Sequence, residues 1–290
     1  MTEVHAGRMA GPFNLPPLSN LRISPVGLDP KADGSFRLIT HLSYPKSDTS
    51  SVSANIMDSF KTVKYASFDR VVDMVFDLGT GALMAKRDIK SAFRLLPIHP
   101  DDFNLLGVQI EGRIFVNKSL PFGCSCAPFL FECFSTFIHW SVKQASKIDN
   151  LDHYLDDFIL CGKKGTNDCQ KLIMHFNAIC SELGVPINER KSEGPTTVMT
   201  FLGLVIDSDR MLICIPTPKT IELRALLTKY LDVKKNSLLK LCFFGRAIRT
   251  SRAFTRRFYD AMAGVKRSFY KIRITDNMRE DMKKLARVSI

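Results

Sequence analysis

The chain has 290 residues, 45% of them hydrophobic, which predicts a packed globular protein and excludes a disordered chain. That length suits one large domain or two to three subdomains. No run approaches about 18 uninterrupted apolar residues, so we expect no membrane partner. The start, Met1 to His5, lacks the apolar core of a signal peptide, so we expect an intracellular protein of the cytoplasm or nucleus.

The net charge of +12 is concentrated near the end of the chain. Residues 217–290 hold 19 Lys and Arg against 6 Asp and Glu, whereas the remainder holds 22 against 23. This asymmetry favours a basic subdomain that contacts a polyanion such as nucleic acid. The alternative is a solvated, lysine-rich surface. The eight cysteines form no Cys-x-x-Cys pair, which favours free thiols.

The first half of the chain predicts hairpins and one helix. Residues 1–23 contain Pro12, Pro16 and Pro17 and are predicted to be irregular. Apolar runs on either side of turn residues predict two β-hairpins, within 24–43 and 105–116. Between them, residues 44–66 are predicted to form a loop and residues 67–82 a helix.

The second half predicts more helix. A long helix is expected after Pro128 and another over about 167–183, from apolar residues at helical spacing. Three further helices are expected in the basic tail, starting near residue 223, after Ser237 and around Phe254. Strands and helices mix without strict alternation of strand and helix, so the predicted fold class is α+β with antiparallel strands, followed by a small helical bundle.

Two adjacent carboxylates stand out in the run Tyr154-Leu155-Asp156-Asp157, which interrupts the apolar stretch 151–161. Short strands on either side place the pair at a hairpin tip, where ionised carboxylates require a cation. Asp88, which ends a segment that begins with the apolar run 82–85, is the candidate partner. Three such carboxylates suit two Mg²⁺ ions, or Mn²⁺, in phosphoryl transfer. The alternative is that the pair only caps a surface turn.

Six segments in this order resemble the reverse transcriptase domain of retroelements, nearest to DIRS-type and gypsy-type elements. They are Ser24–Arg37, Asp88–Phe93, Leu120–Pro128, Tyr154–Asp157, Gly184–Lys191 and Phe201–Gly203. The resemblance implies a right-hand polymerase fold. Residues 1–81 would form an N-terminal segment and the fingers, residues 82–215 the palm, with 95–122 belonging in part to the fingers, and residues 216–290 a basic helical thumb.

The resemblance also implies how the metal site is built. Asp88 and Asp156 would hold the metal ions, with Asp157 assisting, and Ile89 would add its backbone carbonyl. Lys191 aligns with a lysine proposed in the family to protonate the leaving pyrophosphate. The alternative for Lys191 is a surface residue in a charged loop.

Five residues are implied in nucleotide binding. Lys31 and Arg37 would grip the triphosphate, Arg with a bidentate fork and Lys as a point charge. Phe93 would block the 2′-hydroxyl and so select deoxynucleotides; its alternative role is core packing. Gly123 would let the backbone approach a base or sugar closely. Phe122 departs from retroviral enzymes, which carry a glutamine at this position, and a polar contact to the nucleotide is lost.

Primer and template contacts are implied at the hairpin and in the tail. Tyr154 and Leu155 would back the hairpin against the primer end, or serve as core residues. Phe201, Leu202 and Gly203 resemble the primer grip. The thumb candidates are arginines mostly at spacings of three and four, which would contact phosphate: Arg246, Arg249, Arg252, Arg256 and Arg257.

The predicted function is therefore RNA-directed DNA polymerase of a retrotransposon. Its partners would be an RNA or DNA template with a primer and deoxynucleoside triphosphates. Two alternatives stay open: a catalytically inactive, domesticated or fragmentary relic that binds nucleic acid, and an RNA-dependent RNA polymerase. The sequence leaves the oligomeric state open.

Overall fold

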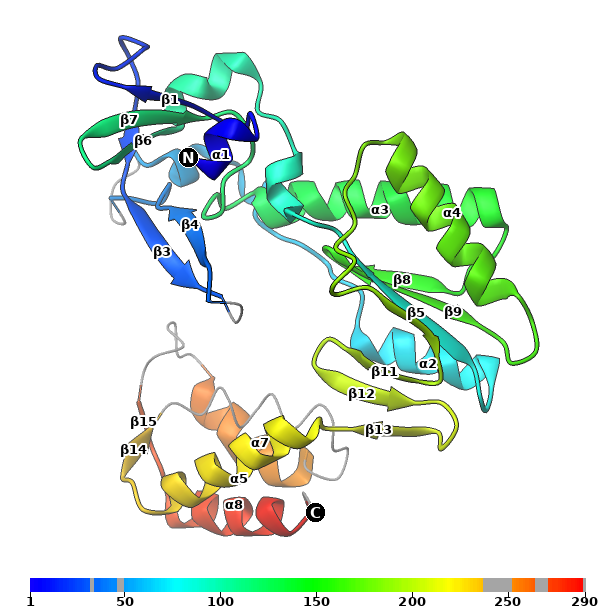
Figure 1. The fold of residues 1–290 in the computed structure, drawn as a ribbon. Helices are drawn as coiled ribbons and strands as arrows, with labels where there is room; N and C mark the ends of the chain where they lie inside the picture. The colour runs from blue at the N-terminus through cyan, green and yellow to red at the C-terminus, as the bar shows by residue number, and fades with distance from the viewer. Residues whose placement is uncertain (32–33, 46–49, 237–251, 264–270, 289–290) are drawn as a thin grey trace. The chain divides into compact units, whose positions relative to one another are not determined.

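The computed structural model describes residues 1–31, 34–45, 50–236, 252–263 and 271–288, with the backbone alone at 235–236, 252–255 and 285–288. The chain divides into two compact units. The first unit comprises residues 1–74 and 84–195, and the second comprises residues 75–83 and 196–290. Figure 1 shows the order of the elements along the chain.

The first unit begins with strands rather than the irregular segment predicted for residues 1–23. A four-stranded sheet has the order β1-β7-β6-β2. Strand β1 pairs with β7, Met9 opposite Asn117, so a distant hairpin supplies the partner that the local sequence does not reveal. Pro12 is tolerated because the register of β1 shifts between Ala10 and Phe13. The bounds are α1 Thr2–His5, β1 Met9–Phe13, β2 Ile23–Ser24, β6 Gly107–Ile110 and β7 Arg113–Asn117.

Both predicted hairpins are confirmed. Strands β3 (Val26–Pro30) and β4 (Phe36–Thr40) pair antiparallel as a separate two-stranded ribbon. Strands β6 and β7 form the other hairpin, with Ile110 opposite Arg113. The predicted helix near 67–82 is α2 (Phe68–Leu78). Four short 3₁₀ turns complete the connections: η1 Val52–Asn55, η2 Asp58–Phe60, η3 Ala92–Leu95 and η4 Pro100–Leu105.

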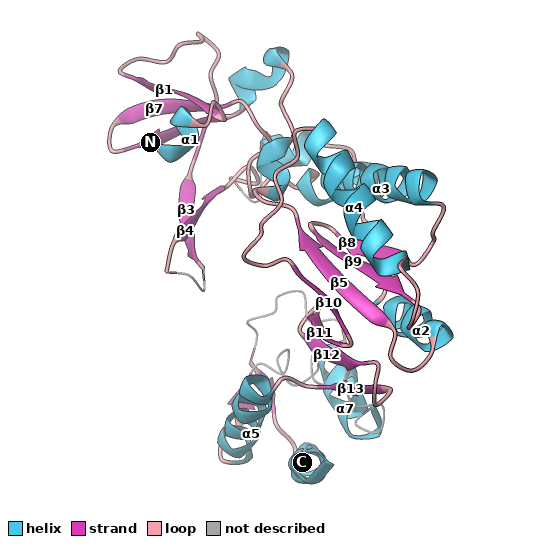
Figure 2. Ribbon diagram, turned by 45° about the vertical axis from the view of Figure 1, so that its right-hand side comes forward, coloured by secondary structure: helices cyan, strands magenta, loops and turns pink. Residues whose placement is uncertain are grey.

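A second sheet of order β10-β5-β9-β8 forms the rest of this unit. Helices α3 and α4 pack against each other and on the same face of the sheet (Figure 2). The rings of Phe158 on β9 and Phe176 on α4 are fully buried with their centres 4.9 Å apart, and Phe131 of α3 is also fully buried, so apolar burial holds these layers together. The bounds are β5 Leu83–Asp88, α3 Ala127–Ser146, β8 Leu151–Tyr154, β9 Asp157–Gly162, α4 Asp168–Glu182 and β10 Glu193–Thr196.

The second unit combines a three-stranded antiparallel sheet with helices. The strands are β11 Val198–Phe201, β12 Leu204–Asp207 and β13 Leu212–Cys214. Helices α5 (Thr217–Leu231) and α7 (Arg252–Met262) confirm two predicted helices, and the one predicted after Ser237 lies outside the described residues. Helix α8 (Asp276–Val288) was not predicted. Two short strands, β14 Lys235–Asn236 and β15 Ile272–Arg273, pair with each other.

Helix α8 is stabilised by the hydrophobic core of the second unit. Leu223 and Tyr230 of α5 and Phe258 of α7 are buried against Met278 and Met282 of α8. The two methionines lie four residues apart, so they share one helix face, although charged residues fill most of the helix. None of the helices that the structure describes is long and apolar enough to cross a membrane.

Candidate active site

Three carboxylates meet where strands end. Asp88 is the last residue of β5, Asp157 is the first of β9, and Asp156 lies in the turn between β8 and β9. The backbone N–H of Ile89 donates to the carbonyl of Asp156 over 2.9 Å, which fastens the end of β5 to that turn. The turn is tight, since Leu155 has a left-handed φ of 54° that costs a non-glycine residue free energy. The predicted hairpin with an acidic tip is thus confirmed.

The electrostatics of this cluster favour a bound cation. Burial raises the pKa of Asp156, and burial together with the charges of Asp156 and Asp88 raises the pKa of Asp157 to about 6. Asp88 itself is 2% exposed. Neighbouring carboxylates repel one another when both are ionised, and a divalent cation between them relieves this repulsion. Mg²⁺ and Mn²⁺ both prefer carboxylate oxygen as a ligand. The three residues therefore fit the metal ions that the sequence predicts.

Lys191 contacts the cluster directly. Its Nζ donates to Oδ2 of Asp88 over 2.9 Å, and this hydrogen bond raises the pKa of the lysine. The loop is held in place because the backbone N–H of Asn188 donates to the carbonyl of Asp88 over 2.8 Å. The Lys191 side chain is 63% exposed, so it is both a surface lysine and a partner of the buried carboxylate.

Three of the predicted nucleotide-binding residues form one stack. The guanidinium carbon of Arg37 lies 4.7 Å from the ring centre of Phe122, a cation–π contact. The ring centre of Phe122 is 5.2 Å from that of Phe93, which in turn lies 5.6 Å from that of buried Phe131. Phe93 thus joins the core on one side and the Arg37 side chain, through Phe122, on the other. Lys31 is exposed at the tip of the same hairpin as Arg37.

Gly123 is required by the chain's own backbone. Its φ is +100°, and a Cβ there would lie 2.1 Å from the carbonyl oxygen of Thr40. The backbone N–H of Thr40 donates to the carbonyl of Phe122 over 2.8 Å, which joins β4 to this turn. The sequence predicts a close approach of the Gly123 backbone to a base or sugar. In the structure, the Gly123 backbone approaches strand β4 closely.

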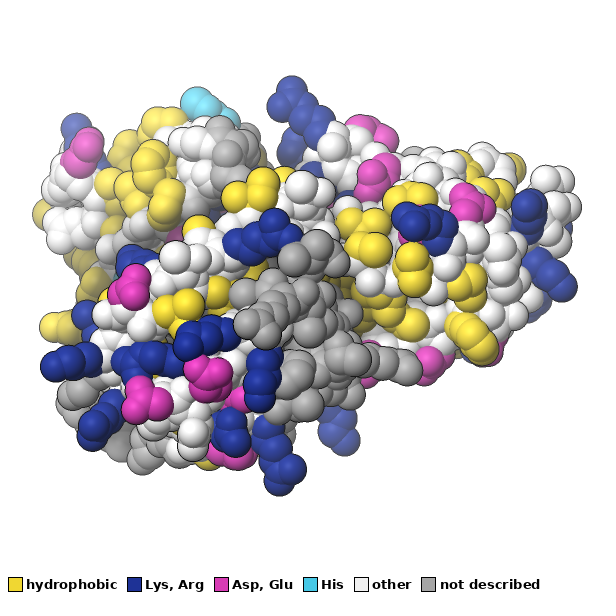
Figure 3. Space-filling view, turned by 90° about the horizontal axis from the view of Figure 1, so that it is seen from below, with side chains coloured by type: hydrophobic (Ala, Val, Ile, Leu, Met, Phe, Trp, Pro, Cys, Tyr) yellow, Lys and Arg dark blue, Asp and Glu magenta, His cyan; other side chains and the backbone are white. Residues whose placement is uncertain are grey.

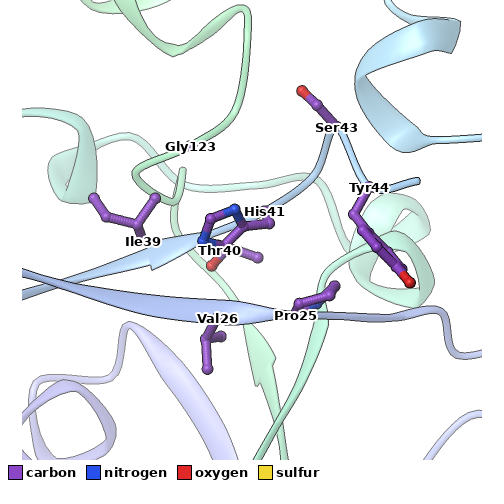
Figure 4. Close-up of a pocket in the computed structure, with 8 residues that line it drawn as sticks. All are labelled: Pro25, Val26, Ile39, Thr40, His41, Ser43, Tyr44 and Gly123. Atoms are coloured by element: carbon purple, nitrogen blue, oxygen red, sulfur yellow. The ribbon is translucent and has the colours of Figure 1, made fainter. Parts of the chain in front are cut away.

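A cavity of about 380 Å³ lies beside that junction. The close-up in Figure 4 shows side chains from both hairpin strands around it, with Gly123 on the neighbouring turn. Its lining residues are Pro25, Val26, Ile39, Thr40, His41, Ser43, Tyr44 and Gly123. None of the three carboxylates lines it, so this cavity is separate from the acidic cluster.

Two residues that support the acidic turn were not predicted from the sequence. The ring of Tyr65 lies 4.5 Å from the ring of Tyr154, centre to centre. The backbone N–H of Leu155 donates to Oε2 of Glu132 over 3.3 Å. Tyr65 belongs to a predicted loop and Glu132 to a mostly apolar helix, so neither stands in a recognisable motif.

The predicted primer-binding residues of the second unit have mixed environments. Phe201 is 1% exposed, and the turn that follows places Leu202 and Gly203 at positive φ. The Nζ of Lys219 donates to the carbonyl of Gly203 over 3.2 Å. The predicted arginines have three outcomes. Arg256 and Arg257 are exposed on α7, Arg252 begins that helix with its side chain not described, and Arg246 and Arg249 lie outside the described residues.

Positive charge at the surface is mixed with negative charge. Figure 3 shows Lys and Arg side chains interspersed with Asp and Glu on the face it draws. One basic residue of α7, Arg257, contacts Asp281 of α8 over 2.7 Å, and that carboxylate is 6% exposed. Arg257, which the sequence predicts as a phosphate contact, therefore balances a buried charge inside the bundle, a role that the spacing of arginines does not indicate.

Comparisons with known proteins identify the family of this chain. Residues 30–206 match the family "Reverse transcriptase (RNA-dependent DNA polymerase)". The chain is 30% identical to Protein P of duck hepatitis B virus (strain United States/DHBV-16) over 128 residues, which are 43% of this chain and 15% of that protein. It is 30% identical to the genome polyprotein of Petunia vein clearing virus over 127 residues, 44% of this chain and 6% of the polyprotein. The chain thus matches only a small part of these relatives.

Solved structures show the fold. A foamy viral protease–reverse transcriptase in complex with double-stranded DNA superposes with a TM-score of 0.67 at 16% identity, over 99% of this chain and 46% of that one. The same kind of enzyme in complex with an RNA/DNA hybrid gives a TM-score of 0.65 at 15% identity, over 99% of this chain and 35% of that one. The α+β right-hand polymerase fold is therefore confirmed, and the chain belongs to the reverse transcriptase family.

Proposed function

We propose that this chain is an RNA-directed DNA polymerase that adds deoxynucleotides to the 3′ end of a primer by nucleotidyl transfer. The observation that carries the proposal is the convergence of Asp88, Asp156 and Asp157 at the joined ends of β5 and the β8–β9 hairpin. The family match over residues 30–206 supports it.

In this mechanism Asp88 and Asp156 hold two Mg²⁺ ions, Asp157 assists, and the carbonyl of Ile89 is a further candidate ligand. When bound, the metal ions would activate the attacking hydroxyl and stabilise the leaving phosphate. The protein otherwise positions the reactants and neutralises charge. Mn²⁺ is an alternative ion, because it accepts the same oxygen ligands.

Basic side chains complete the proposed reaction centre. Arg37 and Lys31 bind the triphosphate, since both lie on the β3–β4 hairpin and Arg37 contributes to the positive potential at Asp156. Lys191, at 2.9 Å from Asp88, donates a proton to the leaving pyrophosphate. Phe93 excludes a 2′-hydroxyl in this proposal, and its ring contact with Phe122, which in turn contacts the Arg37 guanidinium, supports that role.

The proposed partners are a primed RNA or DNA template and deoxynucleoside triphosphates. Support comes from the fold, because the similar foamy viral enzymes are complexes with double-stranded DNA and an RNA/DNA hybrid. The proposed division is fingers within 1–81 and 95–122, palm within 82–215 and thumb within 216–290. An origin in a retrotransposon, and an intracellular location, rest on the sequence motifs and composition.

The test is primer extension on an RNA template with Mg²⁺ and deoxynucleotides. The Asp156→Asn variant keeps the shape of the side chain and removes its charge. We expect it to lose at least about 1,000-fold in extension rate while duplex binding changes less than severalfold. Asp101→Asn, at a carboxylate with an 88% exposed side chain, is the matched control and should extend at the parent rate.

The outcomes separate the alternatives. Extension by Asp156→Asn at the parent rate would overturn the metal assignment. Binding of the duplex without extension by either protein would favour a non-catalytic relic that binds nucleic acid.

A further inference from the structure

A second group of metal-ligating side chains lies behind the acidic hairpin. His139 of α3 and Asp152 and His153 of β8 each offer one ligand atom, and these atoms lie within 4.8 Å of one another. His139 is half-buried, whereas Asp152 is 4% exposed and His153 6% exposed. The group arises because α3 packs on β8, and it uses none of the residues assigned to nucleotidyl transfer.

The imidazole rings of His139 and His153 face each other through their Nδ1 atoms. Nδ1 of His139 and Nδ1 of His153 are 3.0 Å apart. A tetrahedral ion with metal–nitrogen distances of about 2.0–2.1 Å holds two nitrogen ligands about 3.3 Å apart. The present separation is therefore within a few tenths of an ångström of the separation of two ligands on one ion.

The orientation of His153 is fixed from its other side. Its Nε2 lies 3.3 Å from Oε1 of Glu132, close enough for electrostatic attraction, although the angles do not satisfy a hydrogen bond. The ring also stacks on Phe158 with centres 5.1 Å apart. A carboxylate at the outer nitrogen favours the tautomer with its proton there, which leaves the Nδ1 lone pair facing His139.

The chemistry of the group selects the class of metal. Histidine binds a metal ion through the lone pair of its neutral imidazole, and the facing Nδ1 atoms of His139 and His153 offer two such donors. Two imidazoles and one carboxylate suit Zn²⁺ and its neighbours Co²⁺, Ni²⁺ and Cu²⁺, whereas Mg²⁺ prefers oxygen ligands alone. A set of three protein ligands leaves a fourth position for water.

Asp152 also has other contacts. Its Oδ1 accepts a hydrogen bond from the backbone N–H of His153 over 2.9 Å, and its Oδ2 lies 3.5 Å from Nε of Arg70. The Arg70 side chain is 67% exposed, so it can move into solvent when a cation approaches. A carboxylate oxygen has a second lone pair, so the contact with the His153 N–H does not prevent coordination.

We propose that His139, Asp152 and His153 form a binding site for a transition-metal ion of the Zn²⁺ class, separate from the catalytic carboxylates. Glu132 connects this site to the catalytic turn, because its other oxygen accepts a hydrogen bond from Leu155 over 3.3 Å. Glu132 is thus a positioning residue for both the His153 imidazole and the turn that carries Asp156.

The test is titration of the purified chain with Co²⁺ in the presence of excess Mg²⁺, followed by visible absorption. We expect one Co²⁺ per chain with the absorption of a four-coordinate ion, and displacement of that ion by Zn²⁺. His139→Ala should weaken binding at least about 100-fold, and Glu132→Gln about tenfold. His175→Ala, at a histidine of α4 outside the group, is the matched control and should bind like the parent.

Two further variants identify where an ion sits. Binding that is lost in Asp156→Asn but kept in His139→Ala would place the ion at the catalytic carboxylates and overturn the proposal. Binding lost in Cys126→Ser, with thiolate-to-metal absorption in the parent, would place it at the Cys124–Cys126 pair, whose sulfur atoms are 3.4 Å apart. No binding by the folded parent would also overturn it. None of these results depends on extension activity.

Discussion

At the scale of single residues, the position of Phe93 is compatible with both of the roles that the sequence predicts for it. Phe93 contacts Phe122 and Phe131, so its position is set by packing before any nucleotide binds. Core packing and a steric gate, the two interpretations that the sequence left open, are therefore compatible at this residue. A ring held by rigid neighbours excludes a substituent more strictly than a mobile one.

The first prediction concerns this ring. Phe93→Ala should raise the ratio of ribonucleotide to deoxynucleotide incorporation at least about tenfold, because steric exclusion in a pocket is typically worth that much. Single-nucleotide extension with each nucleotide type measures the ratio. Phe134→Ala is the matched control, since Phe134 contacts Phe131 at 5.9 Å but does not contact Phe93 through a ring pair. An unchanged ratio in Phe93→Ala would assign Phe93 to packing alone.

At the scale of elements, the N-terminal strand shows how one buried cation can organise a sheet. The guanidinium of Arg94 is 8% exposed and donates to Asn117 and to the carbonyls of Ser119 and Arg8. Its Nε also donates to Oε2 of Glu3 over 2.9 Å. These contacts tie α1 and the start of β1 to β7, so the segment predicted to be irregular becomes part of the sheet.

The second prediction follows from that network. Arg94→Met should lower the free energy of unfolding by about 3 kcal/mol, because it leaves buried acceptors without their donor. Urea unfolding measures the change. Arg113→Met removes an exposed arginine that donates to Asn14 and should change the stability by less than about 0.5 kcal/mol. Equal effects of the two substitutions would mean that Arg94 does not anchor the N-terminal segment.

At the scale of the whole molecule, positive and negative charges are concentrated in different segments of the sequence. The chain carries a net charge of +12, with the excess in residues 217–290, whereas the acidic cluster lies in residues 88–157. A polymerase has to hold a polyanion and also concentrate divalent cations, and these tasks require opposite charges in different segments.

The third prediction tests the basic segment. Affinity for a primed duplex should fall about 1,000-fold between 50 and 200 mM salt, as expected for several phosphate contacts. Arg256→Gln should reduce the slope of log affinity against log salt by about 0.9, the loss of one contact. Arg257→Gln should instead lower stability, because Asp281 would lose the cation that balances it. A flat salt response would contradict the assignment of this segment to nucleic acid.

The sequence by itself determined several of the elements and the acidic tip of the β8–β9 hairpin. Alternating apolar residues, turn residues and helical spacing are local properties, so both hairpins, α3, α4 and α5 and the Asp156–Asp157 tip could be predicted. Only the tertiary structure decided which distant segments meet. The β1–β7 pairing, the Lys191–Asp88 contact and the stack of Arg37 on Phe122 each join residues far apart in the chain.

Contacts between separate elements also explain the features that the sequence could not indicate. Helix α8 is stable because two methionines pack on a core supplied by α5 and α7, and its own composition is mostly polar. His139 and His153 become neighbours only when α3 is packed on β8. The local sequence determines where strands, helices and turns form. Contacts between separate elements depend on how those elements pack, and the composition of one segment does not indicate that packing.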